Sequence, residues 1–267
     1  MRYFLDVAYD GTRFHGWQVQ PNALTVQEVL DDCLRKVYRL EEVETIGSGR
    51  TDTGVHARQQ WVHVDLPQVL NTEEIKYKLN RILPPDIAIQ TVCGVGPEAH
   101  TRFDAVSRTY KYHITLEKNP FLVHQAYYLS RTPDVSLLNE AAQVLLELED
   151  FTTFSKVKGD TKHYRCTIMH AQWQQEEGQL VFTIKANRFL RGMVRLVVGT
   201  LLDVGKGKLT VAQFREAIEK QDRSLASGAA PAQGLYLHRV EYPEQYFAVQ
   251  QVLFEKVAAE EATKEKE

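Results

Sequence analysis

The stretch GSGRTDTGVHA, residues 47–57, holds a single carboxylate, Asp52, two residues after Arg50. It is too polar and too rich in glycine for a core strand, and it lacks the apolar spacing of an amphipathic helix, so it predicts a loop. An aspartate flanked by Arg50 and Arg58 stays ionised. Such a group is a poor general base, but it can act as a nucleophile or as an electrostatic stabiliser. The structural alternative is an Asx turn, in which the carboxylate accepts backbone hydrogen bonds and glycine supplies positive φ.

A second group of chemically useful residues lies in HTRFDAVSRTYKYHI, residues 100–114, where basic and aromatic side chains alternate: Arg102, Arg108 and Lys111 with Phe103, Tyr110 and Tyr112. The period of two in a strand places Arg108, Tyr110 and Tyr112 on one face and Lys111 on the other. Rings beside basic groups are suited to stacking on bases and contacting phosphates. The alternative is a half-buried strand with tyrosine hydroxyls at the surface.

A third group lies in KANRFLRGMVRLVVGTLLDVG, residues 185–205, with Arg188, Arg191 and Arg195 at positions i, i+3 and i+7. This spacing predicts a helix over about 188–204 with one basic face. Because the N-terminal half of a helix favours anions, we expect a phosphate contact there. The alternative is an ordinary solvated face.

Two similar sets of elements would position these groups. Residues 1–105 predict the order βαββαβ, with strands at 2–9, 43–46, 59–66 and 86–95 and helices after the Thr25 cap and at 72–83. The second half predicts strands at 107–116, 124–130, 165–175, 179–187 and 234–242, and helices at 136–149, 188–204 and after Thr210.

These elements predict an α+β fold of two pseudo-symmetric split-βαβ subdomains, ferredoxin-like or RRM-like, whose antiparallel sheets form a central cleft. The expected divisions are 1–105 for the subdomain with the aspartate loop, 106–245 for the subdomain with the tyrosine strand and arginine helix, and 246–267 for a charged tail. We expect the last part of this tail, residues 255–267, to be a solvated helix end or a frayed terminus.

Composition excludes several classes of function. The net charge of −3 and the 43% of hydrophobic residues are those of an ordinary globular protein, so any nucleic-acid site must come from local clusters of basic residues. The three cysteines form no metal-ligand spacing or disulfide framework, and no signal or membrane segment stands out, which predicts a cytoplasmic protein. Phosphate-loop, dinucleotide and zinc-protease motifs do not occur, so we expect no cofactor and no metal.

Together these stretches resemble the signature blocks of the bacterial tRNA pseudouridine synthase A family, as do YDGTRFHGWQ near the start, DFTTFS at 150–155 and GLYL at 234–237. The resemblance covers roughly residues 1–245 in the same order. It implies two pseudo-symmetric subdomains around a cleft and a cofactor-free homodimer that isomerises uridine to pseudouridine at positions 38, 39 and 40 of the tRNA anticodon arm.

Carried over by position, the resemblance implies that Asp52 is catalytic and that Tyr110, Arg195 and Arg50 bind the substrate. Arg195 would pair with the aspartate, and Tyr110 would lie against the target base. Whether Asp52 attacks the sugar or the uracil ring stays open at this point. Weaker candidates for RNA contacts are Arg58, Arg108, Lys111, Arg188 and Arg191.

Two other classes of function remain open. A non-catalytic RNA-binding module would need the aromatic sheet motif of such domains, which does not occur. A carboxylate-based hydrolase would need a second acid, such as Asp6 or Asp104, beside Asp52.

Overall fold

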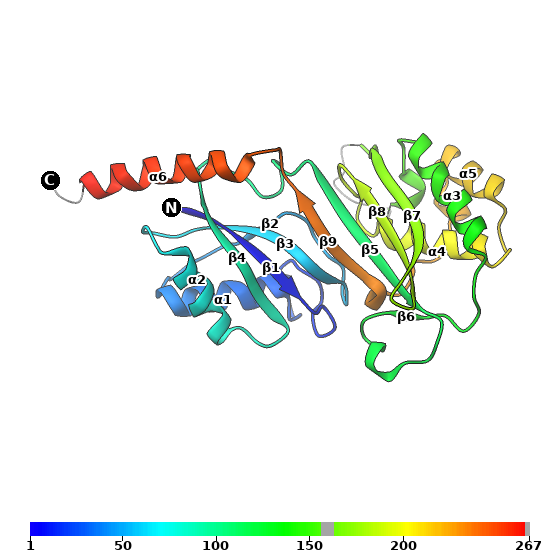
Figure 1. Ribbon diagram of the computed structural model, residues 1–267, viewed down its shortest axis with the longest axis horizontal. Helices are drawn as coiled ribbons and strands as arrows, with labels where there is room; N and C mark the ends of the chain where they lie inside the picture. Colours follow the sequence, from blue (N-terminus) through cyan, green and yellow to red (C-terminus); the bar gives the residue numbers. More distant parts are fainter. Residues whose placement is uncertain (156–162, 265–267) are drawn as a thin grey trace. The chain divides into compact units, whose positions relative to one another are not determined.

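The computed structural model describes residues 1–155 and 163–264, which form a mixed α+β fold with mostly antiparallel strands (Figure 1). The chain divides into two compact units, Met1–Val106 with Arg239–Glu267, and Ser107–His238. Each unit has its own core and is described separately.

The first unit begins with the predicted order βαββαβ: β1 (Arg2–Tyr9), α1 (Val26–Tyr38), β2 (Ile46–Gly47), β3 (His56–Asp65), α2 (Thr72–Ile82) and β4 (Ile87–Val95). Strand β1 lies between β3 and β4 and is antiparallel to both, and the short β2 pairs with β3. Figure 1 shows α1 and α2 side by side next to these strands. The predicted order of elements is confirmed for this part of the chain.

Local signals explain where these helices begin. The backbone N–H of Glu28 donates to Thr25 Oγ1 at 3.3 Å, and that of Glu74 donates to Asn71 Oδ1 at 3.1 Å. The apolar stripe of α1 is buried at Val26, Leu30 and Leu34. Helix α2 buries Ile75 and Leu79 in the same way. The spacing of apolar residues therefore predicts both helices and the sides on which they pack.

The C-terminal segment, expected to be a charged tail, begins as a helix that packs on the first unit. Helix α6 (Tyr246–Lys264) packs on the first unit through Phe254, which is 8% exposed and whose ring centroid lies 5.3 Å from that of Tyr3. A side chain at Gly94 would come within 2.6 Å of the Phe254 ring, so β4 is shaped to receive it. Residues 246–264 are a docked helix. Residues 239–245, expected in the second subdomain, group with the first unit, and residues 265–267 lie outside the described residues.

The second unit contains strands β5 (Ser107–Thr115), β6 (Tyr127–Tyr128), β7 (Ile168–Glu176) and β8 (Gln179–Ala186), with helices α3 (Val135–Glu147), α4 (Met193–Gly205) and α5 (Val211–Glu219). Strand β8 lies between β5 and β7, antiparallel to both. A hairpin turn joins β7 to β8, and in it Glu177 and Gly178 both have positive φ. Strand β9 (Leu235–Glu241) leads the chain from this unit back to the first.

Two predicted elements of this unit are shorter than expected. Of the predicted strand 124–130 only β6 pairs, because the N–H groups of Gln125 and Ala126 both turn back to the carbonyl of Leu122. Helix α4 begins at Met193 and not at 188, because Gly192 has φ 72° and ψ 2°, a left-handed conformation that a right-handed helix cannot contain. Arg188 and Arg191 therefore precede the helix.

Candidate active site

The loop that carries Asp52 joins β2 to β3, and Thr51 is held at two points. The backbone N–H of Trp17 donates to the Thr51 carbonyl at 3.2 Å, and the Tyr9 hydroxyl lies 2.8 Å from Thr51 Oγ1. Tyr9, Trp17 and Thr51 are all buried, and the rings of Tyr9 and Trp17 are stacked with centroids 6.2 Å apart. The peptide that enters Asp52 is therefore fixed by tertiary contacts.

The peptide that leaves Asp52 is held as a turn. The N–H of Val55 donates to the Asp52 carbonyl at 3.1 Å, and that of Gly54 donates to the Phe14 carbonyl at 3.2 Å. Gly54 has φ 76°, which is a conformation that glycine adopts without strain. With both flanking peptides fixed, the half-buried side chain of Asp52 starts from a defined position.

The segment of residues 11–17 wraps closely around this loop. A Cβ on Gly11 would lie 2.0 Å from the Val55 carbonyl oxygen, and one on Gly16 would lie 2.4 Å from that of Thr51. The buried His56 accepts a hydrogen bond from the Gly11 N–H at Nδ1, at 3.0 Å. The glycines of YDGTRFHGWQ therefore serve the aspartate loop, a role that the sequence does not reveal without the fold.

Gln60 of β3 binds the first residues of the loop. Its Nε2 donates to the Gly49 carbonyl at 2.7 Å, and its Oε1 accepts from Ser48 Oγ at 3.1 Å. A Cβ on Gly47 would lie 2.9 Å from the buried indole ring of Trp17 as well as 2.6 Å from Gln60 Nε2, whereas one on Gly49 would meet nothing within 4 Å. Of the two glycines, Gly47 is therefore required by close packing, and Gly49 is not. Arg50 and Arg58 are exposed on either side of Asp52 in the sequence.

The two carboxylates considered as partners for a hydrolase have contacts of their own. Asp6 Oδ2 accepts from Gln59 Nε2 at 3.0 Å, while Asp6 Oδ1 is buried with no hydrogen-bond partner among the described residues. Burial raises the pKa of Asp6 to about 6, against the opposing effect of the Gln59 hydrogen bond. Asp104 Oδ2 accepts from the N–H of His100 and from the Tyr246 hydroxyl.

In the second unit, Tyr110 and Tyr112 have different environments although both belong to β5. Tyr112 is fully buried, and its hydroxyl donates to the Pro231 carbonyl at 2.8 Å. Tyr110 is half-buried, and its ring lies edge-on to Phe189 with centroids 5.1 Å apart. Tyr112 is therefore a core residue, whereas Tyr110 is only partly buried.

Arg195 lies in the first turn of α4 and is tied to the segment that also holds β5. Its Nε donates to the Ala230 carbonyl at 2.7 Å, and the Ala230 N–H donates to the Arg195 carbonyl at 2.9 Å. The next residue, Pro231, is the acceptor for Tyr112. Residues 230–231 therefore link the strand of Tyr110 to the helix of Arg195 within one unit.

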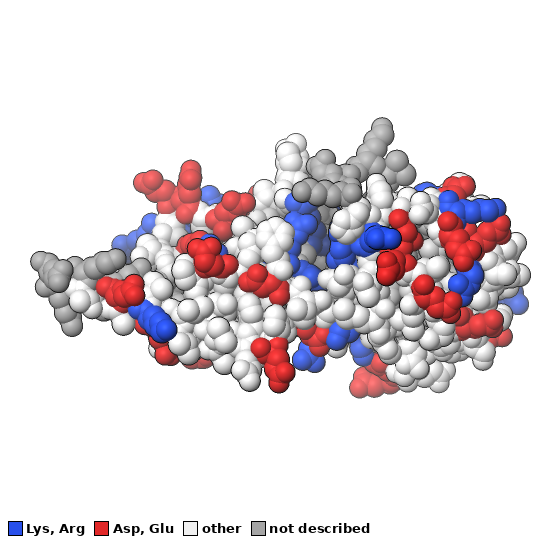
Figure 2. All heavy atoms as spheres, turned by 90° about the horizontal axis from the view of Figure 1, so that it is seen from above, with Lys and Arg blue, Asp and Glu red and all other residues white. Residues whose placement is uncertain are grey.

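Arg188, Arg191 and Arg195 do not form the predicted basic face of one helix, and that prediction is wrong. Arg188 and Arg191 lie before α4, and Arg188 Nη1 is 3.1 Å from His163 Nε2. Arg108 Nη1 donates to the Asn187 carbonyl at 3.0 Å, and Lys111 Nζ pairs with both carboxylate oxygens of Glu176 at 2.8 and 3.0 Å. On the face seen in Figure 2, both basic and acidic side chains are exposed.

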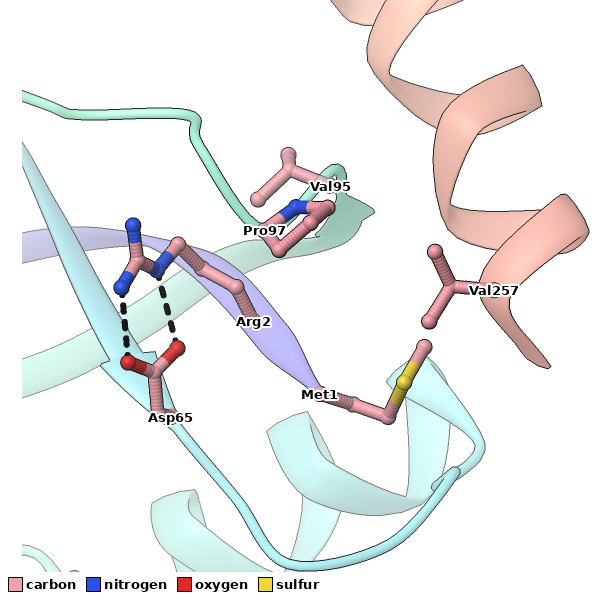
Figure 3. Close-up of a pocket in the computed structure, with 6 residues that line it drawn as sticks. All are labelled: Met1, Arg2, Asp65, Val95, Pro97 and Val257. Atoms are coloured by element: carbon pink, nitrogen blue, oxygen red, sulfur yellow. Dashed lines mark hydrogen bonds and ion pairs between the residues drawn. The ribbon is translucent and has the colours of Figure 1, made fainter. Parts of the chain in front are cut away.

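A hollow of about 260 Å³ next to the N-terminus contains none of the predicted site residues (Figure 3). Its charged groups satisfy one another, because Arg2 donates to both carboxylate oxygens of Asp65, at 2.8 and 2.7 Å. Elsewhere in the described residues, no three His, Cys, Asp or Glu side chains lie together as a metal site would need. Residues 1–155 and 163–264 also include no helix with the length and apolar character of a membrane span.

A family model and the relatives of similar sequence agree on one family. A family model described as tRNA pseudouridine synthase matches residues 7–104 and 141–243, which include Asp52 and Arg195 but not Tyr110. The chain is 52% identical to tRNA pseudouridine synthase A of Bacteroides thetaiotaomicron over 250 residues, covering 92% of this chain and 93% of that protein. It is 46% identical to the protein of that name from Porphyromonas gingivalis, covering 92% of this chain and 99% of the relative. The relative of that name in Bacillus subtilis is 38% identical, over 91% of this chain and 99% of its own.

Proposed function

The chain belongs to the tRNA pseudouridine synthase A family. From that premise we propose that the protein isomerises uridine to pseudouridine at positions 38, 39 and 40 of the tRNA anticodon arm, with Asp52 as the catalytic residue. The observation that carries this proposal is the aspartate loop. Its peptides are fixed on both sides of Asp52 by Trp17, Tyr9 and Phe14. A carboxylate held in place before the substrate arrives is what catalysis by a single charged group requires.

The reaction breaks the bond between N1 of the base and C1′ of the sugar and forms a bond between C5 and C1′. The proton leaves C5 and N1 gains one, so the substrate and product have the same composition. No oxidant, reductant or transferred group is needed. In one route the Asp52 carboxylate would attack C1′ and displace the uracil, which then turns and reattaches through C5 as the carboxylate leaves. In the other it would add to the uracil ring before the N1–C1′ bond breaks and leave after the C5–C1′ bond has formed.

Tyr110, Arg195 and Arg50 would complete the site as substrate-binding residues. The ring of Tyr110, oriented by Phe189, would stack on the target base and offset part of the few kcal/mol that unstacking a loop uridine costs. Arg195, whose Nε donates to the Ala230 carbonyl, would pair with the Asp52 carboxylate. Arg50 would hold a phosphate close to the reacting nucleotide.

The remaining basic residues would contact the RNA backbone. Because backbone contacts do not depend on the base sequence, they suit one site that serves neighbouring uridines. These basic residues are Arg58, Arg108, Lys111, Arg188 and Arg191. We further propose that the enzyme acts as a homodimer in the cytoplasm and needs neither cofactor nor metal. The cleft between two subdomains, expected from the sequence, remains a prediction.

The experiment that tests the function is incubation of unmodified tRNA with the protein alone, in the presence of a chelator. We expect pseudouridine in the anticodon arm with no free base released. Release of uracil would instead identify a hydrolase, and tight binding without any change in the RNA would identify a non-catalytic RNA-binding module.

A further inference from the structure

A short turn of the first unit, residues 100–104, is held by several internal hydrogen bonds. The N–H of His100 donates to Asp104 Oδ2 at 2.8 Å, and the Asp104 N–H donates back to the His100 carbonyl at 3.1 Å. His100 Nδ1 accepts from the N–H groups of Arg102 and Phe103, at 3.1 and 3.3 Å. The turn is thus cross-linked by hydrogen bonds from both of its ends.

The turn is also anchored to the base of the aspartate loop. Thr101 is fully buried, and its Oγ1 donates to the carbonyl of Ile46, which belongs to the strand β2 that leads into the loop. On the other side, the hydroxyls of Tyr242 and Tyr246 donate to the Thr101 carbonyl and to Asp104 Oδ2 at 2.7 and 2.6 Å. Any displacement of the turn would therefore disturb the entry to the loop.

On this fixed support, Phe103 is 75% exposed. Its ring rests on His100 with centroids 4.2 Å apart, and the Arg102 guanidinium lies 5.8 Å from the ring centroid. An aromatic side chain so exposed contributes little to a core. A ring that rests on an imidazole, with a guanidinium beside it, is instead arranged as a stacking surface.

We propose that Phe103 stacks on an unpaired base of the substrate RNA other than the target uridine. This inference rests on the proposed function and adds a binding residue to it. RNA is favoured over a protein partner because the basic Arg102 lies beside the ring and because the turn is attached to the loop of Asp52. Loop nucleotides present unstacked bases, and aromatic side chains bind them with little sequence preference.

The test compares Phe103→Ala, Phe103→Leu and Phe103→Trp in binding and turnover of unmodified tRNA. Loss of one stacked base by alanine substitution weakens binding at least about fivefold. We expect that loss in Kd and KM for the alanine variant, with kcat at saturating tRNA within about twofold of the parent, since the reacting atoms are untouched. The leucine variant keeps the apolar volume without the π face, so its Kd should resemble that of the alanine variant. The tryptophan variant keeps a π face and should bind tRNA as tightly as the parent does.

The matched control is Tyr77→Ala on α2, which removes an aromatic side chain that is 64% exposed and belongs to no such turn. It should leave Kd unchanged. The inference is overturned if Phe103→Leu binds tRNA as the parent does, or if Phe103→Ala changes the oligomeric state but not Kd. Binding is measured independently of conversion. A parent protein that binds tRNA without forming pseudouridine would therefore contradict the proposed function, and the Kd values of the variants would still test the stacking role of Phe103.

Discussion

At the scale of the residue, the position of Asp52 depends on a neighbour that touches no substrate in the proposed mechanism. The buried contact between the Tyr9 hydroxyl and Thr51 Oγ1 is 2.8 Å long and joins β1 to the loop. Thr51→Val keeps the side-chain shape and removes this hydrogen bond. We expect a loss of about 1 kcal/mol in stability and a fall in kcat with little change in KM, because the carboxylate would be less well placed.

The control for this prediction is Tyr9→Phe, which removes the same hydrogen bond from the other side. If the contact positions the loop, the double variant should lose no more activity than either single variant, since the two changes break one interaction. Fully additive effects on kcat in the four-protein cycle would contradict the role given to this contact.

A second prediction at this scale concerns Asp6, whose pKa burial raises to about 6. That value is above the pKa of about 3.9 in an unfolded chain, so the folded state binds the proton more tightly, and this contribution to stability is lost as the pH rises from about 4 to about 6. Asp6→Asn cannot titrate. We expect its stability relative to the parent to increase across this range and to level off above about pH 7, by about 2 to 3 kcal/mol in all.

Urea unfolding of both proteins at several pH values measures the difference. The new amide also changes the hydrogen bonding around Gln59, but that effect is the same at every pH. A stability difference that does not vary with pH would show that Asp6 titrates normally in the folded protein.

At the scale of the element, α6 is expected to be a structural part of the first unit because Phe254 is buried against Tyr3 and Gly94. Phe254→Ala should cost about 3 to 5 kcal/mol in the free energy of unfolding, the usual range for a buried phenylalanine. Val252→Ala changes an exposed side chain of the same helix, 51% exposed, and should cost less than about 0.5 kcal/mol. Equal effects of the two variants would contradict the docking of α6.

The elements that sequence predicts well are those whose signals are local. Thr25 and Thr210 cap their helices, and in the second case Gln213 completes the reciprocal hydrogen bond. The start of α4 is missed because the helical spacing of the arginines continues across Gly192, and spacing carries no information about the φ of one glycine. The docking of α6 is missed because its partner, Gly94, is remote in the sequence.

In the candidate site, too, local features can be predicted from the sequence, whereas tertiary contacts cannot. Asp52 stands out from composition alone, as the single acid in a loop rich in glycine and arginine. The clamp formed by Tyr9, Trp17 and Thr51 is tertiary, so the sequence gives no direct sign of it beyond the aromatic residues of YDGTRFHGWQ. The family was predicted from its motifs, and the comparisons confirm it.

At the scale of the whole molecule, a chain with net charge −3 must bind an anionic RNA through local groups of basic side chains. If about five such residues contact phosphates, affinity for tRNA should fall at least about a hundredfold between about 50 and 200 mM salt. Arg58→Ala should lower the slope of log Kd against log salt by about one, and Arg81→Ala on α2 should leave it unchanged. An affinity independent of salt would rule out the proposed backbone contacts.

The most direct test of the account is tritium release from tRNA labelled at C5 of uridine, because that hydrogen leaves only when the C5–C1′ bond forms. The parent protein should release tritium. The variant Asp52→Asn should release it at least about a thousandfold more slowly, with a Kd for tRNA within about twofold of that of the parent. The control Glu44→Gln, which removes an exposed carboxylate of the same unit, should release tritium at the parent rate. Release by Asp52→Asn at the parent rate would show that the chemistry belongs to another residue.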